Sequence, residues 1–299
     1  MIKKIVKKIF GKKQKVCLTQ GEHSLKITGG TLEYYVHSDI KTGAVVPVFF
    51  HAAIDRKKIV LPRYEGLGLC KKHMWSGISF ADPVLPMSVS CSLAWFVGND
   101  RYYMLQRELH EFLDKLSKKY HLTFVFHGGS GGGYAALVQK SFFYNRHLAI
   151  VQNPQTNIFD LSRQHTINYF NTYENVPTEA EYVDVLDKYK FIYKVSSEQL
   201  TDVLYFQNQS DELHVNKHFK PFLGSDYVLK NGCLVQEEKN NYYFVGNWGE
   251  GHAILPTDIL EKVLQFAIEQ RSFKGVSNYL CSLEQLRLLN EEQCEEILK

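Results

Sequence analysis

A glycine-rich segment in the middle of the chain constrains the fold more than any other feature. Residues 122–137 read LTFVFHGGSGGGYAAL, an apolar run of strand character followed by glycines and then by small residues of helical character. Within it, Gly128, Ser130 and Gly132 form the pattern G-x-S-x-G. A strand that turns directly into a helix at such a pattern is typical of a parallel sheet with helices packed against it.

The turn at Ser130 is expected to be sharp, with strained backbone angles. Residues two before and two after must lack bulk, which Gly128 and Gly132 satisfy. Such a turn exposes Oγ of Ser130 and directs the N–H of Gly131 to the same space, where it can stabilise a developing oxyanion. The helix expected over 134–142 adds the positive potential of its free N–H groups. The segment predicts Ser130 as a nucleophile and Gly131 as an oxyanion donor.

A phosphate-binding loop is the main alternative, because glycine-rich turns between strand and helix also bind phosphate. The spacing G-x-x-x-x-G-K-[ST] is missing, since no lysine follows until Lys140. The next strand ends in Gln152 and Asn153, so it lacks the acidic residue that would bind a dinucleotide ribose. A flexible turn without chemistry is the other alternative. The candidate partners downstream favour the nucleophile.

A serine hydroxyl is a weak nucleophile at neutral pH and needs a base, which in turn needs an orienting group. With this kind of turn the chain order is serine, acid, histidine. The strand-like run DVLYFQN leads into a turn that contains Asp211, the predicted acid. Glu212 is the alternative. Asp226 is disfavoured, because no strong strand precedes it.

His252 is the predicted base among the 12 histidines. It follows the strand-like run NYYFVGN, and the glycines at 249 and 251 allow the loop to bring the ring back over the sheet. His214 and His218 follow the acid too closely and are expected on the next helix. A second oxyanion N–H usually comes after an early strand. The run VVPVFFHAAIDR therefore predicts Ala52 or Ala53 in that role, although these alanines also suit a helix or the core.

Strands alternating with helices predict one α/β domain over residues 16–299, with a mostly parallel sheet and helices on both faces. Residues 157–200 are expected to be a helical cover, and the C-terminal part to be a helical tail. The three catalytic candidates each follow a predicted strand. Ligands of such sheets bind at the carboxyl ends of the strands, so these candidates are expected to meet there.

Residues 1–15 hold seven lysines and no acid. The apolar side chains of residues 2–10 recur at helical spacing, which indicates a basic amphipathic helix that can lie on an anionic membrane surface. A solvated segment is the alternative. Neither a secretory signal nor an 18-residue apolar run is visible. A cytoplasmic protein is expected, at the inner face of the cytoplasmic membrane if the basic helix binds there.

Composition excludes several other classes. A net charge of +3 gives no global field for nucleic acid. The six cysteines form no CxxC pair, so reduced thiols are expected and disulfides are not. No cluster of cysteine and histidine has zinc spacing, so no metal is predicted. The oligomeric state is left open.

The motifs resemble those of bacterial α/β-hydrolases encoded with capsule and other surface-polysaccharide genes. The resemblance rests on HGGSGGGYAAL, NPQT, QNQSDELHV and GEGHAIL, and extends over roughly residues 45–260. The layout is similar to that of the α/β-hydrolase-type O-acetyltransferase of the meningococcal serogroup A capsule. It implies an acyl-serine intermediate, acetyl-CoA as donor and a sugar hydroxyl as acceptor. Ser130, Asp211 and His252 match the nucleophile, acid and base.

Three functions are open at this point. The first is an O-acetyltransferase acting on surface polysaccharide, with no tightly bound cofactor. The second is an esterase or deacetylase with the same three residues, in which water attacks the acyl-enzyme. The third is a non-catalytic assembly subunit on the same scaffold. The intact serine, acid and histidine favour an enzyme.

Overall fold

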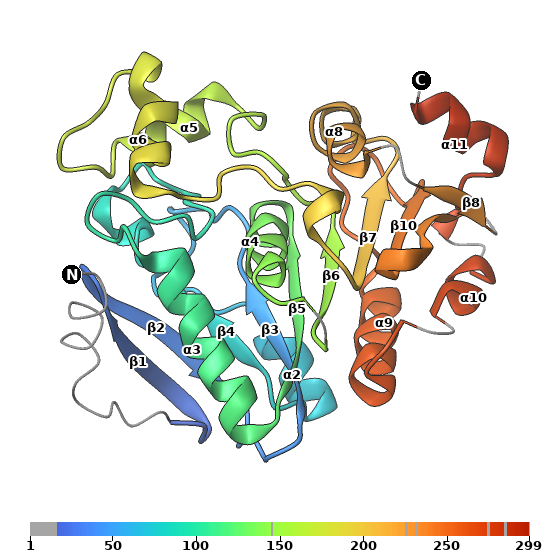
Figure 1. The fold of residues 1–299 in the computed structure, drawn as a ribbon, viewed down its shortest axis with the longest axis horizontal. Coiled ribbons are helices and arrows are strands. Elements are labelled where there is room, and N and C mark those ends of the chain that lie inside the picture. Colours follow the sequence, from blue (N-terminus) through green and yellow to red (C-terminus); the bar gives the residue numbers. More distant parts are fainter. Residues whose placement is uncertain are drawn as a thin grey trace.

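The computed structural model describes residues 17–144, 146–224, 227–230, 233–273, 276–283 and 286–298. Within these residues the chain forms one ten-stranded sheet with helices on both faces (Figure 1). In spatial order the strands are β1 (Gly21–Ile27), β2 (Gly30–Val36), β4 (Ile78–Phe80), β3 (Val45–Phe50), β5 (Thr123–Gly129), β6 (Leu148–Gln152), β7 (Val203–Asn208), β10 (Asn241–Gly246), β9 (Cys233–Gln236) and β8 (Val228–Lys230).

The middle of the sheet is parallel and its two edges are antiparallel. Each neighbouring pair from β4 through β3, β5, β6 and β7 to β10 is parallel. Antiparallel hairpins flank this block, β1 with β2 on one side and β8 with β9 on the other. Because parallel strands end at the same edge, β5, β7 and β10 deliver the segments that follow them to one side of the molecule.

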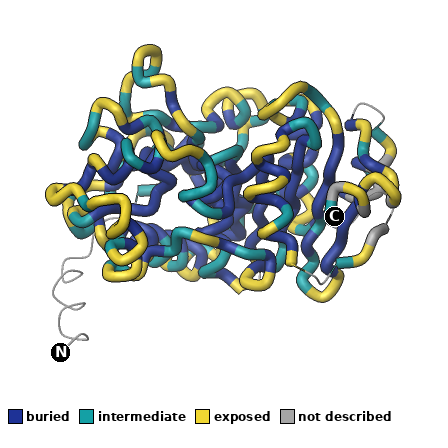
Figure 2. Tube along the Cα trace, turned by 90° about the horizontal axis from the view of Figure 1, so that it is seen from above, coloured by how far each residue is buried: buried dark blue, intermediate teal, exposed yellow. Residues whose placement is uncertain are grey.

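Four helices pack on the two faces of the sheet. They are α2 (Leu67–His73), α3 (Leu105–Tyr120), α4 (Ser130–Ser141) and α9 (Thr257–Gln270). Side chains of β5 alternate between the faces: Phe124 and Phe126 pack with α3 and α4, whereas Val125 packs with α9 and Cys70 of α2. Figure 2 shows the buried core along this sheet. The predicted α/β-hydrolase architecture, a mostly parallel sheet between two helical layers, is confirmed.

Shorter elements occupy the connections and the C-terminal part. They are η1 (Leu85–Met87), α5 (Arg163–Phe170), η2 (Glu179–Glu181), α6 (Tyr182–Tyr189), η3 (Ser197–Gln199), α7 (Glu212–His214), η4 (Val215–Phe219), α8 (Lys220–Leu223), η5 (Glu237–Lys239), α10 (Val276–Cys281) and α11 (Glu291–Leu298). Helices α5 and α6, between β6 and β7, lie on the side of the sheet to which the carboxyl ends of the parallel strands point (Figure 1).

One local expectation was wrong. The helix after the glycine-rich turn begins at Ser130, and not at Tyr134, so three glycines form its first turn. Close packing outweighs their low helix propensity, because a Cβ at Gly133 would lie 2.6 Å from Cβ of Pro154. The short strands β8 and β9 were not expected at all. The basic segment at residues 1–15, with its membrane-binding expectation for 2–10, lies outside the described residues.

Candidate active site

Ser130 lies on a strained turn between β5 and α4. Its φ is 52°, in the left-handed region that non-glycine residues seldom adopt. Ser130 is half-buried, whereas the residues that follow it in α4 are buried up to Lys140. Backbone strain of this kind persists only where the surrounding packing imposes it, and it is concentrated at functional sites. The sharp turn expected from G-x-S-x-G is present.

The glycines around Ser130 are required by close backbone contacts. A Cβ at Gly128 would overlap the carbonyl group of Gly132 and lie 2.7 Å from the nitrogen of Gly133. A Cβ at Gly132 would overlap the carbonyl oxygen of Phe50 and lie 2.9 Å from the carbonyl carbon of His51. The absence of these side chains therefore lets the turn close and lets the end of β3 pack directly on it.

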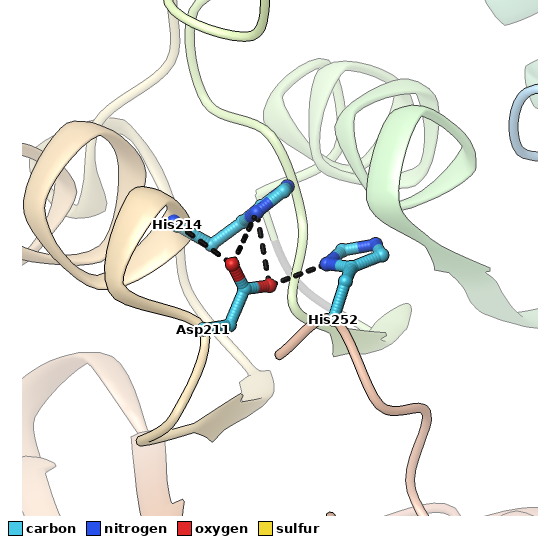
Figure 3. Close-up of side chains that lie close together, drawn as sticks. All are labelled: Asp211, His214 and His252. Atoms are coloured by element: carbon cyan, nitrogen blue, oxygen red, sulfur yellow. Dashed lines mark hydrogen bonds and ion pairs between the residues drawn. The ribbon is translucent and has the colours of Figure 1, made fainter. Parts of the chain in front are cut away.

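Asp211 and His252 meet at the same edge of the sheet. Asp211 follows β7 and caps α7, where Oδ1 accepts from the N–H of His214 at 3.3 Å. Its Oδ2 accepts a short hydrogen bond from Nδ1 of His252, while Nε2 of His252 points away from the carboxylate (Figure 3). Burial alone would raise the pKa of Asp211, but the hydrogen bonds from His214 and His252 outweigh burial and hold it well below its usual range.

A second histidine binds the same carboxylate. Nδ1 of His214 lies 3.1 Å from Oδ1 of Asp211, and the ring of His214 stacks on that of His252 with centroids 4.2 Å apart (Figure 3). Burial lowers the pKa of His214, so its neutral form is favoured. The sequence correctly predicted a helix for His214 and His218, which lie in α7 and η4. It missed the contact of His214 with Asp211, although three-residue spacing at a helix start was a usable signal.

Side-chain amides hold the loop that carries His252. Nδ2 of Asn208, at the end of β7, donates to the carbonyl oxygens of Gly249 at 2.8 Å and Gly251 at 2.7 Å. Nδ2 of Asn153, after β6, donates to the carbonyl oxygen of Ala253 at 2.7 Å. The side chain of His252 stays 40% exposed, against 6% for Asp211. The loop that carries His252 is thus held by hydrogen bonds, while the imidazole stays open to solvent.

The other acid candidates are placed differently. Glu212 is exposed on α7, and it is Asp211 that contacts the histidine ring. Asp226 lies outside the described residues.

Within the described part of the chain, Ser130 and His252 share no hydrogen bond. Oγ of Ser130 instead accepts from Nε2 of Gln155, at 3.1 Å. The backbone N–H of Gln155 also donates to the carbonyl oxygen of Ser130, at 3.1 Å. Gln155 comes from the segment after β6, and sequence reasoning gave it no role. Catalytic contacts are often long before substrate binds, so this geometry leaves His252 as a candidate base.

The predicted oxyanion donors lie beside the turn. Gly131 is in the first turn of α4, whose N–H groups have no partner within the helix. The carbonyl oxygen of Ala52 accepts from Nδ1 of His51 at 2.9 Å, and Nε2 of His51 accepts from the N–H of Asp82 at 3.3 Å. Burial lowers the pKa of His51, consistent with this neutral ring. The peptide between Ala52 and Ala53 is therefore oriented by a buried side chain.

Asp211, His214 and His252 are also the group of side chains most suited to a metal in the described residues. Their ligand atoms lie within 4.8 Å of one another. The carboxylate already accepts a hydrogen bond from each ring, so direct contacts account for the arrangement.

No helix in the described part of the chain has the length and apolar character needed to cross a membrane.

These features define an α/β-hydrolase fold with a serine at a strained strand-to-helix turn and an acid–histidine pair after later strands. The sequence matches no model of a known protein family and no curated protein sequence. Among solved structures, the chain is similar to the capsule O-acetyltransferase of Neisseria meningitidis serogroup A, with a TM-score of 0.55 and 16% identity, over 86% of this chain and 98% of that one. It is also similar to a thermostable esterase from Pseudomonas putida, with a TM-score of 0.44 and 14% identity, over 93% of this chain and 86% of that one.

Proposed function

We propose that this protein is a serine acyltransferase that moves an acetyl group from acetyl-CoA to a hydroxyl of capsule or another surface polysaccharide. The observation that carries the proposal is the position of Ser130 on a strained strand-to-helix turn, at the sheet edge where Asp211 orients His252. The structural likeness to a capsule O-acetyltransferase spans nearly all of that chain and supports the choice of substrates.

In the proposed first half-reaction, Oγ of Ser130 attacks the thioester carbonyl and His252 takes the hydroxyl proton. The N–H groups of Gly131 and of Ala52 or Ala53 stabilise the oxyanion. The C–S bond then breaks and the CoA thiolate leaves with the proton held by His252. The products of this half-reaction are CoA and an acetyl ester on Ser130.

In the second half-reaction, a sugar hydroxyl gives its proton to His252 and attacks the ester carbonyl. Collapse of the tetrahedral intermediate breaks the bond to Oγ, and the proton on His252 returns to Ser130. Asp211 keeps the imidazole oriented and stabilises its charged form throughout. An esterase would follow the same steps with water in place of the sugar, and it is the second candidate because the imidazole of His252 is open to solvent.

The test is release of free thiol from acetyl-CoA, with and without a panel of capsule-type oligosaccharides, for the wild type and Ser130→Ala. We expect release that accelerates with a glycan and falls by at least about 10³-fold in the variant, because removal of a triad nucleophile has effects of that order. Cleavage of simple esters without turnover of CoA would favour the esterase. Equal rates for both proteins would refute a role for Ser130 and favour a non-catalytic function.

A further inference from the structure

The side chain of Gln155 is fully buried and its orientation is determined by its two partners. Its Oε1 accepts a short hydrogen bond from the indole Nε1 of Trp95, and its Nε2 donates to Oγ of Ser130. An indole N–H only donates, so the oxygen of the amide must face Trp95 and the nitrogen must face Ser130. The amide therefore presents a donor, and not an acceptor, to the candidate nucleophile.

Trp95 is held in place by a strained and buried loop. Trp95 and Phe96 have φ values of 54° and 55°, and both are buried. The N–H of Phe96 donates to Oδ2 of the buried Asp82 at 2.6 Å, which fixes the loop to the end of β4. The indole ring also packs edge-on against Tyr169, with centroids 5.8 Å apart. Two consecutive left-handed residues are costly, and they set the direction of the indole N–H.

The same loop contacts the nucleophile turn directly. A Cβ at Gly131 would lie 2.5 Å from Cδ1 of Leu93, so Leu93 packs on the first turn of α4. The loop thus reaches the turn in two ways. Leu93 packs on Gly131, and Trp95 acts on Oγ of Ser130 through Gln155. The two hydrogen bonds of the amide direct an N–H donor at Oγ of Ser130. Filling the core would not require a donor at this position.

We propose that Gln155 is a catalytic residue that stabilises Oγ of Ser130 as it leaves the acyl-enzyme, and that Trp95 is the positioning residue that keeps the donor in place. This inference rests on the proposed function, because it needs an acyl-Ser130 intermediate. It adds a third donor, separate from the oxyanion hole, which acts on the serine oxygen and not on the carbonyl oxygen of the substrate.

The two half-reactions use this donor differently. In the free enzyme the hydroxyl oxygen of Ser130 already accepts from Gln155, so the bond exists before acylation and changes little in its transition state. In the acyl-enzyme, Oγ is an ester oxygen and a poor acceptor. It gains negative charge only when the C–Oγ bond breaks and the electron pair returns to it. Interactions that strengthen only in the transition state are those that accelerate a step. Gln155 should therefore accelerate deacylation more than acylation.

The experiment uses the full-length protein and p-nitrophenyl acetate as the acyl donor. Stopped-flow measurement separates the burst, which reports acylation, from the steady state, which reports deacylation, and intact-mass measurement quantifies acetyl-Ser130. In Gln155→Met, which keeps the length but lacks the donor, we expect the steady-state rate to fall about 10- to 100-fold, as for loss of one hydrogen bond to a charged atom. The burst rate should fall less than about threefold, and acetyl-enzyme should accumulate.

Gln139→Met is the matched control, because Gln139 is also buried, on α4, and donates to the carbonyl oxygen of Gln106 at 3.1 Å. It should leave the ratio of burst to steady-state rate unchanged. Trp95→Phe removes the N–H that orients the amide and should change the ratio in the same direction by a smaller factor. It keeps the test decisive if Gln155→Met fails to fold.

Two negative results have different meanings. A wild-type protein that is not acetylated on Ser130 would contradict the proposed function and this inference with it. If the wild type shows a burst, a constant ratio of burst to steady-state rate in Gln155→Met would overturn the role of Gln155 alone. This holds whether both rates are unchanged or both fall equally, since an equal fall indicates general damage to the site. If Gln155→Met is unfolded, the same criterion applies to Trp95→Phe.

Discussion

At the scale of single residues, the site is organised around one carboxylate shared by two imidazoles. Asp211 accepts from Nδ1 of His252 on one side and from Nδ1 of His214 on the other. His214 is nearly completely buried; its ring stacks on that of His252 and packs at a tilt against that of His218. A carboxylate with two ring donors and a backbone donor has little freedom to rotate. We infer that His214 positions Asp211 for its contact with His252.

Replacing His214 with Phe should keep the stacking and remove the hydrogen bond to Asp211. We expect kcat to fall about 10- to 100-fold with KM nearly unchanged, as for loss of one hydrogen bond to a charged group. Asp211→Asn should cost more, about 10⁴-fold. His110→Phe is the control, because His110 stacks on Phe142 with centroids 4.9 Å apart and makes no contact with Asp211. Wild-type kcat in His214→Phe would show that His252 and the cap of α7 suffice to hold Asp211.

At the scale of elements, the turn at Ser130 depends on how closely β3, β5 and α4 approach one another. The end of β3 packs on Gly132, and Gly128 packs on the first turn of α4. The requirement for glycine at these positions is local, which is why the sequence alone predicted the turn correctly. The start of α4 was predicted four residues late, because glycine propensity is a weak guide where packing fixes the backbone.

Gly132→Ala should destabilise the protein by roughly 1–3 kcal/mol, the usual cost of overpacking, because its Cβ meets backbone atoms of Phe50 and His51 that cannot move aside cheaply. Gly68→Ala is the matched control. Gly68 is exposed in α2 with nothing within 4 Å of an added Cβ, so this change should stabilise by about 0.5–1 kcal/mol. Urea unfolding followed by circular dichroism measures both. A Gly132→Ala protein as stable as the wild type would mean that the end of β3 shifts to make room.

At the scale of the whole molecule, the fold was predictable and part of the site was not. Strand, turn and helix patterns repeat along the chain, so the sheet follows from many local signals. Asp211 and His252 could be proposed because each follows a strand, and their catalytic roles stay predictions. Gln155 could not be found, because its role depends on Trp95 and Ser130, which are distant in sequence. The strands β8 and β9 are only three and four residues long, too short for a clear periodic pattern.

Buried ionisable groups should make the whole protein sensitive to acid. Burial lowers the pKa of His37 and of His147 to about 4 and that of His218 to about 3, so the folded state keeps them neutral. Between pH 6.5 and 4 the unfolded chain binds protons that the folded chain does not. Stability is therefore full above pH 6.5 and falls as the pH is lowered, by roughly 1.4 kcal/mol per pH unit for each histidine.

Asp82 opposes this trend. Burial raises its pKa to about 6, so between pH 4 and 6 the folded state binds a proton that the unfolded state has lost, which favours folding at the lower pH. The three histidines outweigh this one carboxyl group. Urea unfolding at pH 7.5, 6 and 5 should show a falling free energy of unfolding, with a steeper fall in Asp82→Asn. A value that is constant over this range would contradict the buried, neutral state of these histidines.

The hairpin of β8 and β9 has a consequence for β10, the strand that leads to His252. Strand β10 is not an edge of the sheet. Besides its pairs with β7, its residues 241–243 pair with β9, and Val245 and Gly246 are bonded to residues 288–289. Fraying and association with other chains begin at edge strands. The exposed edge is β8. The end of β10 nearest His252 is bonded to residues 288–289 and not to β9, so local opening of the hairpin should leave it protected from exchange with solvent. The exposed edge of the sheet thus lies two strands away from the strand that leads to His252.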